Sequence, residues 1–103
     1  MPDYQQQVAR FVSENSLETT ISPRLLDLVS EVGELAKEVL KGSDYGKSKF
    51  KNPDTWESEL GDVFFSLICV ANGTGVDLEK ALQSVLVKYS KRLSHTGDAG
   101  SGK

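Results

Sequence analysis

The 103-residue sequence has one cysteine and one histidine. A single cysteine cannot form an internal disulfide, so we expect Cys69 to be a small apolar side chain in the core. No basic and apolar leader precedes the first predicted helix, which argues against a secretory signal and favours a cytoplasmic location. His95 falls within residues 94–103, a small and polar tail that we expect to be disordered, so we expect no metal or catalytic role for it.

The sequence also has no long apolar run and no excess of positive charge. Its longest apolar stretch is far shorter than a membrane span, so we expect no membrane partner. Its formal net charge of −3 gives no long-range attraction for a nucleic-acid polymer. With 38% hydrophobic and 26% charged residues, the chain has the composition of a soluble globular protein. We therefore expect one domain, residues 1–93.

Apolar residues recur at helical spacing in four segments of the chain. We predict helices over residues 3–15, 22–41, 56–73 and 77–93. Residues that often begin or end helices flank these segments: Asp3, Ser22 with Pro23, Gly42, Asp54 with Glu57, and Asp77. The sequence thus predicts an all-α, four-helix bundle-like protomer with three long helices and an N-terminal helix.

The segment from residue 56 to 73 is apolar on nearly every side of a helix, which predicts that it lies in the interior. Three small amphipathic neighbours cannot cover such a helix completely, so we expect a homodimer or a homotetramer. The one polar stripe on it contains Glu59, Asp62 and Ser66. An ionised carboxylate in an apolar interior requires a proton, a cation or a metal ion.

The predicted second helix also has an acidic face, formed by Asp27, Glu31, Glu34 and Glu38. If the two acid-bearing helices are antiparallel, the pairs Glu31/Glu34 and Glu59/Asp62 face each other, which is favourable mainly around divalent cations. Carboxylate ligands without Cys or His favour Mg²⁺ first and Mn²⁺ second. A ferritin-like di-iron site is disfavoured, because it needs histidines on its helices.

Basic and aromatic residues near these acids are candidates for substrate contacts. Residues 42–55 form a loop rich in Gly, Ser, Asn and Pro, which either solubilises the chain or binds phosphate. Trp56 follows it, and its ring is a core, interface or base-stacking side chain. Lysines and an arginine that could hold a triphosphate are Lys47, Lys49, Lys51, Lys88 and Arg92.

Two segments resemble a known family. The stretches EVGELAKEVLKG (31–42) and ESELGDVFFSLICVANGTGVDLEKAL (57–82) are similar to MazG-like members of the all-α nucleoside triphosphate pyrophosphohydrolases, which have two E-x-x-[ED] pairs on adjacent helices. The similarity spans roughly residues 22–93. Lys88, Tyr89 and Arg92 also match the family's N-x-K-F-x-x-R-like run, although Leu86 stands where the asparagine is expected.

The resemblance implies a function and a site. It implies that Glu31, Glu34, Glu59 and Asp62 bind Mg²⁺ and that a (d)NTP is cleaved to (d)NMP and pyrophosphate, often for nucleotide-pool house-cleaning. Either Glu31 or Glu38 could orient the attacking water. The alternatives are a phosphoribosyl-ATP pyrophosphohydrolase, a dUTPase-like enzyme, and a non-catalytic helical interaction module.

Overall fold

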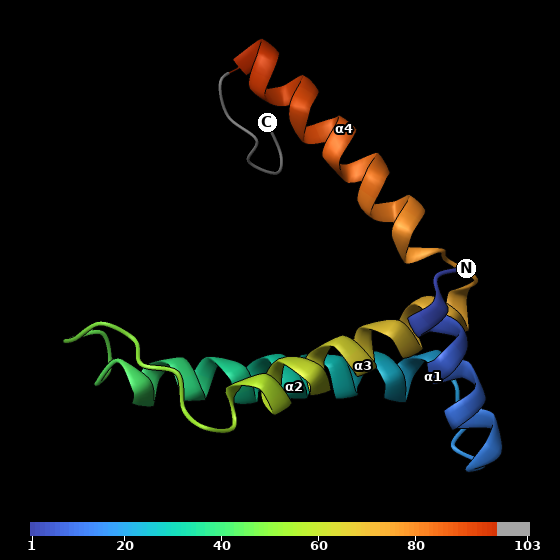
Figure 1. Ribbon diagram of the computed structural model, residues 1–103, viewed down its shortest axis with the longest axis horizontal. Helices are drawn as coiled ribbons and strands as arrows, with labels where there is room; N and C mark the ends of the chain where they lie inside the picture. Colours follow the sequence, from blue (N-terminus) through green and yellow to red (C-terminus); the bar gives the residue numbers. More distant parts are fainter. Residues whose placement is uncertain (97–103) are drawn as a thin grey trace.

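The computed structural model describes residues 1–96 and consists there of four α-helices without strands (Figure 1). The helices are α1 (Asp3–Glu14), α2 (Ile21–Gly42), α3 (Trp56–Thr74) and α4 (Leu78–Thr96). The predicted all-α fold is therefore confirmed. The predicted polar tail begins too early at 94, because residues 94–96, including His95, continue α4. Its remainder, residues 97–103, lies outside the described residues. No helix of the described part is long and apolar enough to cross a membrane.

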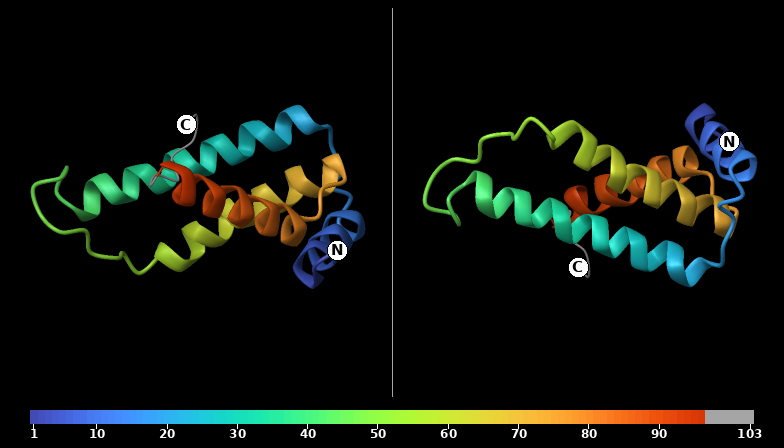
Figure 2. Two further views of the ribbon diagram at one scale, coloured as in Figure 1. Left: turned by 90° about the horizontal axis from the view of Figure 1, so that it is seen from above. Right: turned by 90° about the horizontal axis from the view of Figure 1, so that it is seen from below.

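The helices α2 and α3 lie side by side as an antiparallel hairpin (Figure 2). Among the residues that the structure describes, the buried apolar ones are Ile68, Cys69 and Ala71, and all three lie in the second half of α3. The first half of α3 is more open than its sequence predicts, because Phe64 remains 45% exposed. The prediction of an interior helix is therefore met only at the C-terminal end of α3 within one chain.

The short helix α1 packs across the C-terminal half of α3. Two aromatic pairs join them: the ring centroids of Tyr4 and Phe64 lie 5.1 Å apart, and those of Phe11 and Phe65 lie 6.2 Å apart. Edge and tilted contacts of this kind stabilise aromatic packing beyond simple area burial. The aromatic face of α1 therefore fixes this helix at one end of the hairpin.

The last helix, α4, leaves the hairpin and extends away from it (Figure 1). Its apolar residues stay open within the chain, since Leu82 is 55% and Leu86 50% exposed. Apolar side chains of α2 are open as well, with Leu26 68% exposed. The bundle is thus not closed within a single chain, which leaves apolar faces on two helices uncovered.

The helix ends differ from the prediction in several places. The residue before α2 is Thr20 rather than Ser22, and Gly42 belongs to the helix. The predicted capping box at Asp54 is wrong, because Thr55 precedes α3 and no side chain caps its amides. The first residue of α1 is Asp3 itself, which follows Pro2. We attribute the positions of the helix ends to packing between α2 and α3, because apolar contacts contribute more free energy than a single helix cap.

The loop between α2 and α3 folds back onto the end of α2. Ser43 is buried, where its Oγ donates to the carbonyl of Val39 and accepts from the amide of Gly46. The ring of Phe50 lies against Gly42 so closely that an added Cβ would come within 2.7 Å of it. A side chain at position 42 would therefore push the loop away.

Candidate active site

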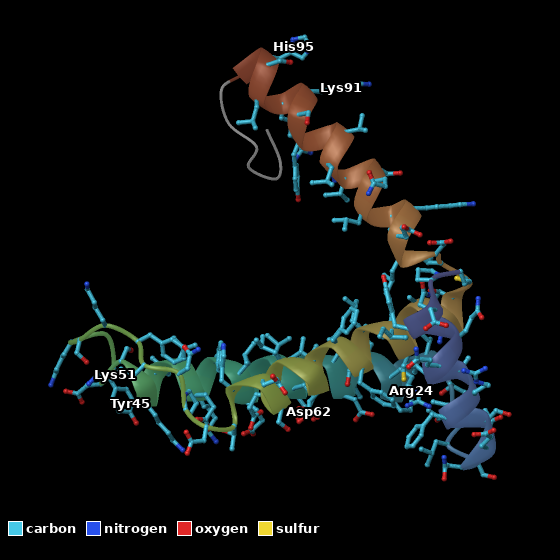
Figure 3. All side chains as sticks on the ribbon, viewed as in Figure 1. Arg24, Tyr45, Lys51, Asp62, Lys91 and His95 are labelled. Carbon is cyan, nitrogen blue, oxygen red and sulfur yellow. The ribbon has the colours of Figure 1, made fainter. Side chains whose placement is uncertain are left out.

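Carboxylates from both arms of the hairpin converge near its middle. Glu59 and Asp62 are three residues apart on α3 and so lie on the same side of that helix. One carboxylate oxygen from each of Glu31, Glu59 and Asp62 lies within 4.8 Å of the other two. Asp62 is seen on the hairpin in Figure 3. We call these three residues the acid cluster.

The acid cluster is electrostatically unfavourable without a cation. Desolvation raises the pKa of Glu59 above its ordinary value of 4.5, and repulsion from Asp62, Glu38, Glu31 and Glu34 raises it further. All the charged groups that shift the pKa of Glu59 are acids, and none of them lowers it. Positive charge at the cluster would therefore stabilise the fold.

Two further acids of α2, Glu38 and Glu34, act on Glu59 from outside the acid cluster. Glu38 is half-buried and acts on the pKa of Glu59 more strongly than Glu31 does. Glu34 is exposed and has the weakest of these effects. The expectation that the acids would be deeply buried is wrong, because Asp62 is exposed and Glu59 only half-buried. The structure thus brings together three of the four predicted metal ligands.

The donor set of the cluster fits a hard divalent cation. All its ligand atoms are carboxylate oxygens from two rigid helices, which is the chemistry that Mg²⁺ and Mn²⁺ prefer. His95 stands near the far end of α4 in Figure 3, away from Asp62. The cluster thus consists of carboxylates alone among the described residues.

The basic residues are separated from the cluster within one chain. The loop carries Lys47, Lys49 and Lys51, all exposed, at one end of the hairpin (Figure 3). On α4, Lys88 and Arg92 both lie close to the Tyr89 ring, with Lys88 Nζ 5.4 Å and Arg92 Cζ 5.7 Å from its centroid. Because α4 points away from the hairpin, these two cations lie away from the acid cluster of their own chain (Figure 1).

Trp56 stands one turn before Glu59 on α3. Its half-buried ring contacts the ring of Phe50 edge-on, with 4.9 Å between the centroids. This contact ties the loop to the start of α3. One face of the hairpin thus carries, in order along α3, an aromatic ring and then the acids.

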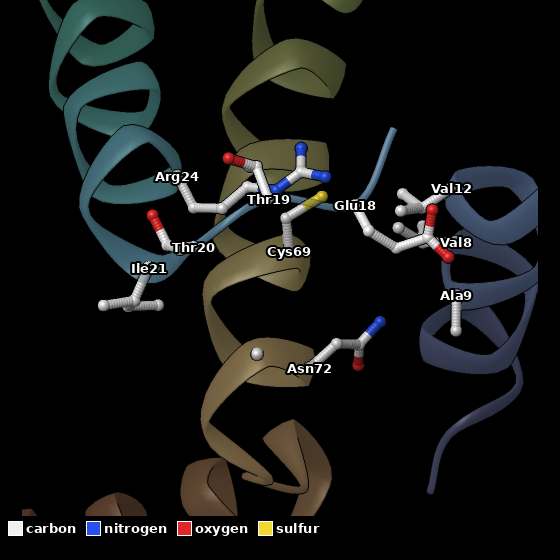
Figure 4. A pocket seen from close by; sticks show the side chains of 11 residues that line it. Val8, Ala9, Val12, Glu18, Thr19, Thr20, Ile21, Arg24, Cys69 and Asn72 are labelled. Atoms are coloured by element: carbon white, nitrogen blue, oxygen red, sulfur yellow. The ribbon is translucent and has the colours of Figure 1, made fainter. Parts of the chain in front are cut away.

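A hollow of about 340 Å³ lies at the other end of the hairpin, between α1, α2 and α3 (Figure 4). Arg24, Cys69 and Asn72 line it, and burial raises the pKa of the Cys69 thiol while Arg24 opposes that effect. Sequence reasoning did not single out this arginine. Its spacing could have indicated a role, because Arg24 stands seven residues, about 10 Å along α2, from Glu31. Cys69 stands the same distance along α3 from Asp62.

Comparisons with known proteins agree on one family. The model of the MazG nucleotide pyrophosphohydrolase domain matches residues 19–97. The uncharacterized protein YpjD of Bacillus subtilis (strain 168) is 36% identical over 97 residues, which cover 89% of this chain and 85% of that protein.

Two solved structures have the same fold. The Bacillus-conserved MazG protein, described as a nucleotide pyrophosphohydrolase, superposes with a TM-score of 0.70 at 34% identity, over 84% of this chain and 85% of that one. The crystal structure of YpjD from Bacillus subtilis, described as a pyrophosphatase candidate, gives a TM-score of 0.69 at 33% identity over 95% of both chains. With four helices, paired acids and a family match over most of its length, this chain belongs to the MazG nucleotide pyrophosphohydrolase family.

Proposed function

We propose that this protein is a Mg²⁺-dependent pyrophosphohydrolase that cleaves a (d)NTP between its α- and β-phosphates, which releases (d)NMP and pyrophosphate. The observation that carries the proposal is the convergence of Glu31, Glu59 and Asp62 within 4.8 Å. Glu34, on the next turn of α2 and on the same side as Glu31, completes the ligand set when a cation draws it in. We assign the activity to nucleotide-pool house-cleaning, and Mn²⁺ is the second choice of cation.

The residues of the site divide the chemistry between them. A divalent cation bound by the acid cluster supplies positive charge for the phosphoryl oxygens and favours deprotonation of water. The carboxylate of Glu38 or Glu31 accepts a proton from the attacking water. The water oxygen then bonds to the α-phosphorus as the bond to the bridging oxygen breaks, and pyrophosphate departs with the electron pair.

The triphosphate needs cations that a single chain does not bring to the acid cluster. We propose that the protein is a homodimer or homotetramer in which α4 of one chain packs against the hairpin of another. Leu82 and Leu86 on α4, and Leu26 on α2, are the exposed apolar residues that such packing would cover. Lys88 and Arg92 then reach the phosphates across the subunit boundary, and Lys47, Lys49 and Lys51 approach from the loop.

The base then lies on one of two sides of the acid cluster. Trp56 offers an aromatic ring on one side, and the partly open hollow beside Arg24 offers space on the other. Because the ring of Trp56 is already in contact with Phe50, we assign the base to the hollow. Comparing Arg24→Met with Trp56→Leu tests this choice. A change of base preference in Trp56→Leu alone would contradict it.

The experiment that tests the function is product analysis. Purified protein is incubated with a panel of NTPs and dNTPs plus Mg²⁺, and pyrophosphate and orthophosphate are measured separately. We expect equal amounts of monophosphate and pyrophosphate from at least one nucleotide. Orthophosphate as the first product would contradict the proposed cleavage position, and no product from any nucleotide would contradict the function.

A further inference from the structure

The most buried side chain of the described chain is a polar one. Gln5 on α1 is only 1% exposed. Its Nε2 donates to Oδ1 of Asn72 at 3.0 Å and to the carbonyl of Val76 at 2.8 Å, and its Oε1 accepts from the amide of Leu78 at 2.8 Å. In return, Nδ2 of Asn72 donates to the carbonyl of Gln5 at 3.0 Å. One amide side chain thus joins α1, the end of α3, the α3–α4 turn and the start of α4.

The segment that Gln5 joins is the corner between α3 and α4. Gly75 ends α3 with a φ of 72°, a left-handed conformation that glycine adopts without strain. The amide of Val76 closes the turn by donating to the carbonyl of Ala71 at 2.9 Å. Leu78 is the first residue of α4, where backbone amides have no partner within the helix, so the Oε1 of Gln5 satisfies one of these amides.

Little else within the chain holds α4 in its direction. The helices that pack extensively in the described part are α2 with α3 and α1 with α3. In Figure 1, α4 leaves the hairpin at the end where α1 lies and touches the rest of the chain near its own first turn. A 19-residue helix is about 28 Å long, so a small rotation at its first turn moves its far end by many ångströms.

We propose that Gln5 is a positioning residue, which through its bonds to Asn72, Val76 and Leu78 fixes the angle of α4 to the hairpin. Lys88 and Arg92 stand about three and four turns along α4 from Leu78, which Gln5 contacts, and depend on that angle to reach a triphosphate. This second part of the proposal rests on the proposed function. Burying an amide side chain costs desolvation free energy, which its hydrogen bonds offset only when all partners are in the right geometry. A buried amide can therefore favour one angle between α4 and the hairpin.

The test compares Gln5→Met with Gln7→Met, the same substitution two residues along α1. Gln7 is exposed and bonds to Asp3 of its own helix, so its loss leaves the corner unchanged. Spin labels at Lys37→Cys on α2 and Ser84→Cys on α4, with Cys69 replaced by Ala, report the angle through their separation. Labelled chains are diluted with unlabelled ones, so that only distances within a chain are seen.

We expect one narrow distance distribution for the parent and for Gln7→Met, and a broad one for Gln5→Met. In unlabelled protein we expect the KM for the nucleotide to rise about tenfold in Gln5→Met, with kcat within about twofold of the parent. A merely structural residue would lower the melting temperature without broadening the distance or separating KM from kcat.

The other possible results of these two measurements would each contradict part of the proposal. A folded Gln5→Met with a narrow distance would overturn it, and a broad distance with an unchanged KM would overturn the link to Lys88 and Arg92. If Gln5→Met does not fold, Asn72→Asp replaces it, since that carboxylate still accepts from Gln5 but no longer donates to its carbonyl. A parent protein that hydrolyses no nucleotide would contradict the proposed function, while the distances would still decide what holds α4.

Discussion

The hairpin of α2 and α3 and the helix α4 are built from similar apolar repeats but reach different states within one chain. The hairpin buries Ile68, Cys69 and Ala71 and brings three carboxylates together. The helix α4 leaves Leu82 and Leu86 half open and carries its two cations away from those carboxylates. The acidic residues therefore lie on the hairpin and the two basic residues on α4, and these two parts of the chain do not pack together extensively.

This difference assigns separate roles to the two regions. The acids of the hairpin come from two helices that pack on each other, so a single chain brings them together. The apolar side of α4 stays uncovered within one chain, and we propose that another chain covers it. Changes in the hairpin should therefore affect chemistry directly, and changes in α4 should act through assembly and substrate affinity.

The largest effect is expected from the acid cluster. Asp62→Asn and Glu59→Gln each remove a ligand charge, so kcat/KM should fall by at least about 10²-fold, more than loss of an outer partner usually costs. Helical content should persist, because removing one acid relieves repulsion. Steady-state kinetics and circular dichroism measure the two effects. Glu57→Gln, on the exposed side of the same helix, is the matched control and should retain activity.

A tenfold effect is expected from the cations of α4. Arg92→Ala should raise KM by about tenfold, because a charge-assisted bond to phosphate is lost. The neighbouring exposed residue Lys91 gives the control, Lys91→Ala, with little change in KM.

Mixing two impaired proteins, assayed at a nucleotide concentration well below KM, tests whether α4 acts across the subunit boundary. Chains with Asp62→Asn and chains with Arg92→Ala are mixed and allowed to exchange. If a cation from one chain serves the acids of another, a mixed dimer has one intact site, and about a quarter of the parent's sites become active. Recovery no greater than the sum of the two separate proteins would place Arg92 at the site of its own chain.

Assembly should depend on the open face of α4. Leu82→Asp places a charge where we expect an apolar contact, so the protein should shift to monomers and lose about 1.5–3 kcal/mol of assembly free energy per buried leucine. Analytical ultracentrifugation measures the association. Ser84→Asp, an exposed change on the same helix, is the control. Equal association of both variants would show that another face forms the interface.

The pH dependence of cation binding follows from Glu59. Its raised pKa means that the folded protein holds this proton more tightly than the unfolded chain, so the repulsion destabilises the fold as pH rises past 4.5. Mg²⁺ should therefore raise the melting temperature more at pH 7.5 than at pH 4.5. Thermal melts with and without Mg²⁺ measure this difference. A Mg²⁺ effect that does not depend on pH would contradict the role of the cluster's protonation.

The smallest effects concern two glycines with open surroundings. An added Cβ meets no atom within 4 Å at either Gly75 or Gly33, so only backbone conformation matters. Gly75→Ala should cost about 1 kcal/mol of unfolding free energy, because position 75 has a positive φ. Gly33→Ala lies within α2 and should gain about 0.5–1 kcal/mol. Chemical denaturation measures both, and the same sign for both would contradict the conformational explanation.

The sequence predicts local features of this fold well. Helical spacing placed all four helices, and Asp77 bonds the amide of Lys80 at 3.1 Å as expected of a cap. The i and i+3 spacing of Glu59 and Asp62 placed two acids together, and the antiparallel arrangement of α2 and α3 brings them to Glu31. Apart from the contact with Glu31, these features depend on residues close in sequence.

Features that depend on distant residues were not predictable from spacing. The sequence indicated an interior α3, but Phe64 and Leu60 remain open because α4 does not return to cover them. Spacing does not distinguish Gln5 from the neighbouring glutamines of α1, yet it bonds to residues 67–73 positions away. Helical periodicity predicts which face of a helix a residue lies on, but it does not predict which other helix packs against that face.

Equilibrium binding of Mn²⁺ tests the central claim most directly, because free Mn²⁺ gives an electron paramagnetic resonance signal that is lost on binding. The parent protein, at pH 7.5 and without nucleotide, is compared with Asp62→Asn and with Glu57→Gln. We expect the parent and Glu57→Gln to bind the ion and Asp62→Asn to bind it at least about tenfold more weakly. Equal binding by all three proteins would contradict a cation site formed by the acids of α2 and α3.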